Sequence, residues 1–206
     1  MGWTGLFDGK SLNGWHGFNK TGPVNNWIVK DESLVCLGAI SGVDYGGDLV
    51  TNGTYENFGL KWDWKLDPGS NSGLMYHVTE GKKFKAPYET GPEFQLMDDA
   101  AYDGRADSNQ KSGADYGMYA PNSNKVLKPV GEWNHGKLIF NYGHVEHWLN
   151  GKKIVKFYQQ SEDWKGRKES GKWKTFPYYG NAKSGKICLQ DHGHKAYFKN
   201  IIIKEL

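Results

Sequence analysis

Cysteine is almost absent from this 206-residue chain, which contains only Cys36 and Cys188. Each lies within a short apolar run, so both are expected to be buried structural thiols, and a disulfide or a nucleophilic cysteine is the less favoured alternative. A domain of this length buries roughly 70% of the surface that its unfolded chain exposes. Neither a disulfide nor a metal ion is therefore needed to stabilise the core.

Long apolar runs and an excess of one charge are also missing. No segment approaches the roughly 18 apolar residues that a membrane-spanning helix needs, and the first five residues contain no signal-peptide core. The 26 basic and 23 acidic residues leave a net charge of only +3, and the basic cluster 165–174 is interrupted by Glu169. We therefore expect that the protein neither binds nucleic acid nor spans a membrane. Nothing in this composition specifies an oligomeric state.

Apolar residues nowhere recur every three to four positions over several helical turns, whereas 28 glycines separate short alternating segments. This pattern predicts an all-β fold of two antiparallel sheets with almost no helix. The clearest strand is 58–66, in which apolar and polar residues alternate. The other predicted strands are 27–29, 33–37, 73–78, 93–97, 116–120, 137–142, 145–149, 152–158, 186–190 and 196–204.

Turn signals and loops organise these strands. The pairs Asn150-Gly151 and Tyr142-Gly143 fit tight hairpin turns, in which both central residues have positive φ. The last strand, 196–204, contains the run 201–203 of three isoleucines and is expected inside a sheet, beside the N-terminal strand. Segments 98–113 and 161–179 are predicted to be long ordered loops, the second with at most a helical turn around Trp164. No linker or repeat divides the chain, which predicts a single domain over residues 1–206.

Several catalytic and metal-binding motifs are absent. The chain has no nucleophile elbow, phosphate-binding loop or paired-cysteine metal site. His192 and His194 alternate, so on a strand they would point to opposite faces and be poor joint metal ligands. The acidic group Asp98, Asp99 and Asp103 has the oxygen ligands that calcium prefers, but a solvated acidic loop is the favoured interpretation. We therefore predict no metal and no cofactor.

Aromatic residues make up 15% of the chain, and several fall beside polar residues in predicted loops. Aromatic rings stack on the C–H faces of sugars, while amides and carboxylates bind the hydroxyl groups, so the mixture suits a carbohydrate cleft. Filling of the sandwich core is an equally good explanation on composition alone. The candidate loop aromatics are Trp15, Tyr45, Tyr102, Tyr119, Trp164 and Trp173.

Polar residues on predicted strand faces form the candidate site. In 93–97, alternation sends Phe94 to one face and Glu93 and Gln95 to the other, and further on Gln190 and His192 likewise share a face. Polar residues on a face that should be apolar mark a functional site. Further candidates are His147, Asn71, Tyr119 and Asp191.

Short motifs in order along the whole chain resemble the 3-keto-disaccharide hydrolase domain family. Each motif is weak alone, but the set is specific. The motifs are Leu6-Phe7-Asp8-Gly9-Lys10-Ser11-Leu12-Asn13-Gly14-Trp15, Asn71-Ser72-Gly73, Glu93-Phe94-Gln95, Gly131-Glu132-Trp133-Asn134, 145–151, 185–193 and Phe198-Lys199-Asn200-Ile201.

The resemblance implies a concanavalin-like jelly-roll β-sandwich, export to the periplasm or cell surface of Bacteroidetes-type bacteria, and glycosidase action on an oligosaccharide or glycoside oxidised at C3. A C3 ketone acidifies the C2 proton, so a base, an acid and an enolate donor suffice for cleavage by elimination and hydration. Glu93 is the expected base, His192 the acid or enolate donor and His147 the reserve. The residues expected to bind substrate are Asn71, Gln95, Tyr119, Gln190 and Asp191.

Two alternatives remain open from the sequence. A jelly roll can be a non-catalytic, lectin-like carbohydrate-binding module without any change of architecture. Ordinary retaining hydrolysis would need two carboxyl groups about 5 Å apart, and Glu93 with Asp191 is the available pair. Alternation places Asp191 off the face shared by Gln190 and His192, which disfavours this third possibility.

Overall fold

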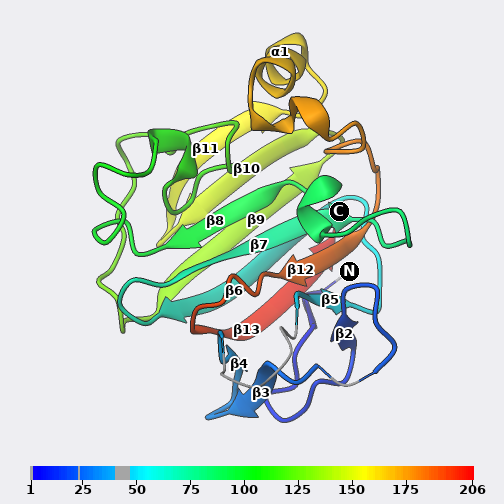
Figure 1. Cartoon of the computed structure of the whole chain (residues 1–206), viewed down its shortest axis with the longest axis vertical. Coiled ribbons are helices and arrows are strands. Elements are labelled where there is room, and N and C mark those ends of the chain that lie inside the picture. The colour runs from blue at the N-terminus through cyan, green and yellow to red at the C-terminus, as the bar shows by residue number, and fades with distance from the viewer. Residues whose placement is uncertain (1, 23, 40–46) are drawn as a thin grey trace.

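The computed structural model describes residues 2–22, 24–39 and 47–206 and consists mainly of β-strands in two stacked antiparallel sheets (Figure 1). The larger sheet has the order β11-β10-β9-β6-β13-β4-β3, with β1 paired to β13, and the smaller has the order β2-β5-β12-β7-β8. The all-β, two-sheet prediction is thereby confirmed. The strands are β1 (Thr4–Gly5), β2 (Trp15–Gly17), β3 (Trp27–Lys30), β4 (Ser33–Cys36), β5 (Leu49–Thr51), β6 (Phe58–Leu66), β7 (Asn71–Val78), β8 (Glu93–Met97), β9 (Asn134–Asn141), β10 (His144–Leu149), β11 (Lys152–Tyr158), β12 (Lys186–Leu189) and β13 (Ala196–Glu205).

The core lies between the inner faces of the two sheets. In β6 the alternating residues Phe58, Leu60, Trp62, Trp64 and Leu66 are all buried, as the sequence pattern predicts. The Trp62 ring meets Phe94 of β8 edge to face, with 5.0 Å between ring centroids. A buried aromatic ring removes some 150–250 Å² from water, which corresponds to roughly 4–6 kcal/mol of transfer free energy. These rings hold the smaller sheet, and thus β8, in a fixed position on the larger one.

Both predicted hairpin turns are present. Asn150 and Gly151 have φ values of 48° and 80°, and Tyr142 and Gly143 have φ values of 47° and 83°. The turns close the β10–β11 and β9–β10 hairpins. The last strand, β13, lies between β6 and β4 and also pairs with β1, which confirms its predicted place inside the sheet beside the N-terminal strand.

Two local predictions are wrong. Residues 116–120 do not form a strand, because Gly117 has φ +73° and the Met118 N–H donates to the Asp115 carbonyl, closing a turn. Segment 161–179 contains the helix α1 (Glu162–Ser170) and the 3-10 helix η3 (Lys172–Thr175). The Ser161 hydroxyl caps α1. Because Trp164 is its one buried residue, α1 shows no apolar periodicity in the sequence.

Helix α1 lies at one end of the sandwich (Figure 1), and a stack of three aromatic rings connects α1 and η3 to it. Tyr179 lies between Trp164 and Trp173, with ring centroids 6.0 and 4.2 Å away and interplanar angles of 7°. Trp15 is also buried and donates its indole N–H to the Leu6 carbonyl. These three tryptophans were candidates for sugar stacking, but they are core residues. Tyr45 lies outside the described residues.

The remaining features of the described part of the chain concern its cysteines, membrane-spanning helices and short 3-10 helices. Neither Cys36 nor Cys188 forms a disulfide, and both are buried, which confirms the prediction of structural thiols. No helix among residues 2–22, 24–39 and 47–206 is long and apolar enough to cross a bilayer. The remaining elements are the short 3-10 helices η1 (Pro87–Glu89) and η2 (Ser108–Gln110), which lie on either side of β8 in the sequence.

Candidate active site

The outer face of the smaller sheet carries the polar residues that the strand pattern predicts. Phe94 and Leu96 of β8 point into the core, whereas Glu93 and Gln95 line a cavity together with Asn71 of β7. Gly73, opposite Gln95 on β7, makes room for the acid, since a Cβ at this position would lie 1.9 Å from Glu93 Oε1. A glycine is therefore required beside the Glu93 carboxylate.

The segment that follows β12 supplies the next two residues of the cavity, Gln190 and His192. It is tied to β7 because the Gln190 N–H donates to the Gly73 carbonyl at 2.9 Å and the Ser72 hydroxyl donates to the Gln190 carbonyl at 2.8 Å. His192 and His194 follow the strand in a loop and stack with 5.6 Å between ring centroids. The argument from alternation holds only on a strand and so does not apply to these two histidines, which lie in the alternative setting of a turn or loop.

Three residues from separate segments complete the cavity: Tyr88, Tyr116 and Lys172. The Lys172 ammonium lies 4.4 Å from the Tyr116 ring centroid and 4.7 Å from that of Trp173. The Trp173 indole N–H donates to the Tyr116 carbonyl at 2.8 Å. The aromatic stack that holds η3 therefore also positions a cation at the cavity.

The cavity itself has a volume of about 120 Å³. A neighbouring cavity of about 390 Å³ shares Tyr88, Gln190 and His192 with it and extends to Asp48, Lys85 and Asp191. The two cavities are therefore adjacent, and together they offer space for a small glycoside.

Three side-chain oxygens in the smaller cavity are buried and accept no hydrogen bond from the described residues. They are Glu93 Oε1, Asn71 Oδ1 and Gln190 Oε1. A buried acceptor without a partner costs about 1–3 kcal/mol, so three of them in one cavity indicate a site for a ligand that donates several hydrogen bonds. A sugar presents such hydroxyl groups.

The electrostatics of the cavity shift three pKa values. Burial raises the pKa of Glu93 to about 8, against the opposing attraction of Lys172. Burial lowers the pKa of Lys172, against the attraction of Glu93, and the pKa of His192 is lowered first by burial and then by His194. In the neighbouring cavity, burial raises the pKa of Asp48 to about 7. A carboxyl group with a pKa near neutrality is suited to general acid–base chemistry.

Five of the eight predicted site residues line this cavity together: Glu93, His192, Asn71, Gln95 and Gln190. Their grouping is a finding about geometry only. The Gln95 amide is held there, donating from Nε2 to the Gln110 carbonyl at 3.0 Å. The roles assigned to these residues stay predictions.

The other three predicted residues lie elsewhere. His147 is completely buried behind Phe94, on which it stacks at 4.6 Å, and its Nδ1 contacts the Gly113 carbonyl. Tyr119 stacks on Phe157 and donates to Asp163 of α1. Asp191 lines the neighbouring cavity, where Asn26 donates to its carboxylate at 2.7 Å. His147 and Tyr119 therefore lie outside this cavity, and the roles given to them stay predictions.

Sequence reasoning missed Tyr88, Tyr116 and Lys172 as cavity residues. Tyr88 belongs to η1, and Lys172 is the first residue of η3. Each is brought to the cavity by a long segment that connects two strands. The one available signal was the length of these connections, because long ordered segments in a compact domain are commonly functional.

The three carboxylates of the acidic group Asp98, Asp99 and Asp103 contact groups within the chain. Asp98 accepts from the Gly69 N–H, Asp99 is paired with Lys125, and Asp103 is paired with Lys111. Within the described residues, no group of three or more histidine, cysteine, aspartate or glutamate side chains is placed to hold a metal ion.

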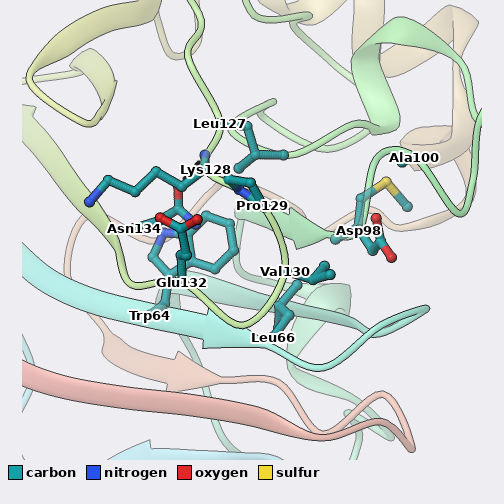
Figure 2. Close-up of a pocket in the computed structure, with 11 residues that line it drawn as sticks. Trp64, Leu66, Asp98, Ala100, Leu127, Lys128, Pro129, Val130, Glu132 and Asn134 are labelled. Carbon is teal, nitrogen blue, oxygen red and sulfur yellow. Dashed lines mark hydrogen bonds between the residues drawn. The ribbon is translucent and has the colours of Figure 1, made fainter.

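Figure 2 shows a separate cavity of about 300 Å³ near the end of β6. Its walls include Trp64, Leu66, Leu127 and Val130, with the Asp98 carboxylate to one side. None of the predicted site residues lines it. Its lining also contains Lys128, Glu132 and Asn134, but among the described residues it lacks the buried oxygens without partners that distinguish the cavity on the smaller sheet, which remains the candidate active site.

Comparison with known proteins agrees with this architecture. A protein from Parabacteroides distasonis, described provisionally as a glycosyl hydrolase, has a crystal structure that matches this one with a TM-score of 0.91. The two sequences are 48% identical, and the match covers 100% of this chain and 94% of that one. An endo-β-1,3(4)-glucanase of glycoside hydrolase family 16 is 13% identical with a TM-score of 0.52, covering 99% of this chain and 84% of that one. This likeness shows the fold alone and confirms the jelly roll.

Sequence relatives identify the family. A 3-keto-disaccharide hydrolase from Bacteroides thetaiotaomicron is 30% identical over 229 residues, which cover 100% of this chain and 79% of that protein. The model of the 3-keto-alpha-glucoside-1,2-lyase-like domain matches residues 2–204. The chain therefore belongs to the 3-keto-alpha-glucoside-1,2-lyase-like domain family.

Proposed function

We propose that this protein is an enzyme that cleaves glycosidic bonds of sugars oxidised at C3, by removing the C2 proton and eliminating the group at C1. The name of the Bacteroides relative and the family description support this substrate class. The observation that carries the proposal is the buried Glu93 carboxyl, which lies with Lys172, His192 and unpartnered amide oxygens in one polar cavity.

The reaction follows from the acidity of a proton next to a ketone. Glu93 takes the C2 proton, and the electron pair of the C2–H bond forms the C2–C3 double bond of an enolate whose charge rests on the C3 oxygen. The electrons then return to form a C1–C2 double bond as the C1–O bond breaks, and the departing oxygen takes a proton. Addition of water across C1–C2 restores a saturated 3-keto sugar, so elimination and hydration together amount to hydrolysis.

The pKa of Glu93 suits the role of base. A carboxylate with an ordinary pKa of 4.5 is a weak base toward a carbon acid, whereas a pKa of about 8 brings its basicity closer to that of the enolate. A substrate that closes the cavity excludes water and strengthens every charge interaction inside it. The burial that raises the pKa of Glu93 is therefore useful in catalysis.

Lys172 and His192 take the complementary roles. We assign the Lys172 ammonium to protonate the departing oxygen, because burial lowers its pKa and makes it a stronger acid. We assign His192 to the enolate, because its lowered pKa leaves a neutral ring whose N–H can donate to the C3 oxygen at neutral pH. Asn71 and Gln190 would accept hydrogen bonds from substrate hydroxyls.

Retaining hydrolysis by Glu93 and Asp191 is disfavoured. Both Asp191 carboxylate oxygens are occupied, one by Asn26 and the other by the Gly193 N–H. Asp191 also lies outside the group that lines the cavity with Glu93. Binding without catalysis is the remaining alternative, because the same unpartnered oxygens could simply hold a sugar.

The replacement Glu93→Gln separates catalysis from binding, because the amide keeps the shape of the acid but cannot accept the proton. We expect the rate of product release from a 3-keto-glucoside to fall about a hundredfold or more, with substrate affinity changed much less. Glu162→Gln is the control, since its carboxylate is exposed on α1.

Product formation is followed by chromatography and affinity by titration calorimetry. Undiminished turnover in the Glu93→Gln variant would remove Glu93 from the role of base. Absence of turnover by the unmodified protein on 3-keto-glycosides, together with measurable binding, would establish the lectin-like alternative.

A further inference from the structure

A second polar cavity is lined by residues of the β9–β10 turn and of the segment 176–185, which leads from η3 to β12. Its volume is about 580 Å³, within the range of sites that bind small molecules. It shares no lining residue with the candidate active site. Four amide side chains line it, over the ring of Phe140: Asn57, Gln159, Gln160 and Asn181.

Two of these amides are held in fixed orientations. Gln159 and Gln160 both donate from Nε2 to the Gly180 carbonyl, each at 2.7 Å. Gln159 Oε1 is buried, yet it accepts no hydrogen bond from the described residues. The two donors are thus anchored to the backbone, and Gln159, a lining residue, carries a buried acceptor with no partner among the described residues. A hydroxyl group is the simplest partner for such an oxygen.

An exposed aromatic ring stands at the rim of the cavity. Tyr142 is 82% exposed and has φ +47°, although the left-handed region favours glycine or asparagine. Asn57 pins this turn by accepting from the Tyr142 N–H at 2.7 Å. Gln160, with φ +68°, is a second left-handed residue lining the same cavity.

The formal charges at the cavity cancel. Glu56 and Lys183 are its one acidic and one basic lining residue, so the lining favours a neutral ligand over a phosphate or a sulfated group. Amides that bind vicinal hydroxyls and an exposed ring that can cover a C–H face together match a sugar. We propose that this amide cavity is a second glycan-binding site, which takes a neutral, unoxidised sugar unit independently of the cleavage chemistry.

Binding is tested with neutral disaccharides, namely cellobiose, maltose and sucrose. Calorimetry gives the affinity, and nuclear magnetic resonance of the ¹⁵N-labelled protein locates the site through the side-chain amide signals of Gln159 and Gln160. Tyr142→Gly and Gln160→Gly delete lining side chains at positions where glycine relieves strain, so both variants should fold. Asn200→Gly is the control, since Asn200 is exposed, has φ +52° and lies outside the cavity.

We expect at least one disaccharide to shift the Gln159 and Gln160 signals saturably. Its affinity should fall about tenfold in Tyr142→Gly and in Gln160→Gly, and by less than twofold in Asn200→Gly and in Glu93→Gln. The proposal is overturned if no disaccharide shifts these signals, if both glycine variants bind as the unmodified protein does, or if Glu93→Gln abolishes the binding. Binding of glucuronic acid alone, lost in Lys183→Ala, would also overturn it, because the site would then select an anion.

Discussion

Replacing Glu93 with glutamine should make the protein more stable at alkaline pH, an effect separate from any loss of activity. The pKa of the Glu93 carboxyl is raised from 4.5 to about 8 because its charged form is buried. The unfolded chain loses this proton as the pH rises past 4.5, whereas the folded protein keeps it up to about pH 8. Folding stability due to this group is thus fully present below pH 4.5 and is lost between pH 4.5 and pH 8.

The size of the effect follows from the same two values. Each pKa unit corresponds to about 1.4 kcal/mol, so the full difference sets an upper bound of about 5 kcal/mol on the stability lost by pH 8. A neutral glutamine does not incur this loss. Burial also raises the pKa of Asp48, to about 7. Because Asp48 is present in both proteins, both lose a smaller amount of folding stability as the pH rises. The two stability curves should therefore separate steadily from pH 5 to pH 8.

Urea unfolding followed by tryptophan fluorescence measures this separation. We expect Glu93→Gln to match the unmodified protein within about 1 kcal/mol at pH 5 and to exceed it by several kcal/mol at pH 8, with the same urea dependence. Glu162→Gln, an exposed position, should follow the unmodified protein at both pH values. A difference between Glu93→Gln and the unmodified protein that does not change with pH would refute the raised pKa.

Further predictions test how the site is built. Gly73→Ala places a methyl group against the Glu93 carboxylate, so we expect kcat on a 3-keto-glucoside to fall at least about tenfold, whereas Gly166→Ala, whose new methyl meets no atom within 4 Å, should leave it unchanged. Lys172→Met removes both the proposed acid and the charge that lowers the pKa of Glu93, so kcat/KM should fall at every pH and the acidic limb of its remaining pH profile should move to higher pH, neither of which Lys165→Met should cause. Burial raises the pKa of both Cys36 and Cys188, so neither thiol should react with a disulfide reagent until the protein unfolds, and stoichiometric labelling of the folded protein would contradict this.

Strand alternation predicted most of the sheet architecture because each strand has one face in the core. The alternating run 58–66 is β6 with unchanged bounds, and the parity of 93–97 correctly separated Phe94 from Glu93 and Gln95. Very short strands such as β2 and β5 went unnoticed, because three residues are too few to show a period. Helix α1 was missed for a similar reason, since it buries one side chain and its start depends on the Ser161 cap.

The candidate site was only half predictable. Residues on strands or directly after them, such as Gln95 and Gln190, could be grouped because pleating fixes their direction. Lys172 and Tyr88 could not, because their positions depend on how long segments fold over the sheet. His147 lies on a strand but faces the core, where it stacks on Phe94, so it is not among the residues that line the cavity. Histidine alone does not reveal the face on which it lies.

The position of β13 has a consequence for how the protein folds. This last strand joins β6 to β4 and also pairs with β1, with registers such as Leu66 opposite Ala196 and Thr4 opposite Ile203. Until β13 has been synthesised, β3 and β4 have no partner that connects them to β6 in the larger sheet. Contacts between such distant parts of a chain form slowly. We therefore expect the larger sheet to be completed only after β13 has left the ribosomal exit tunnel, and the unpaired edges of β4 and β6 to be the surfaces at which incomplete chains aggregate.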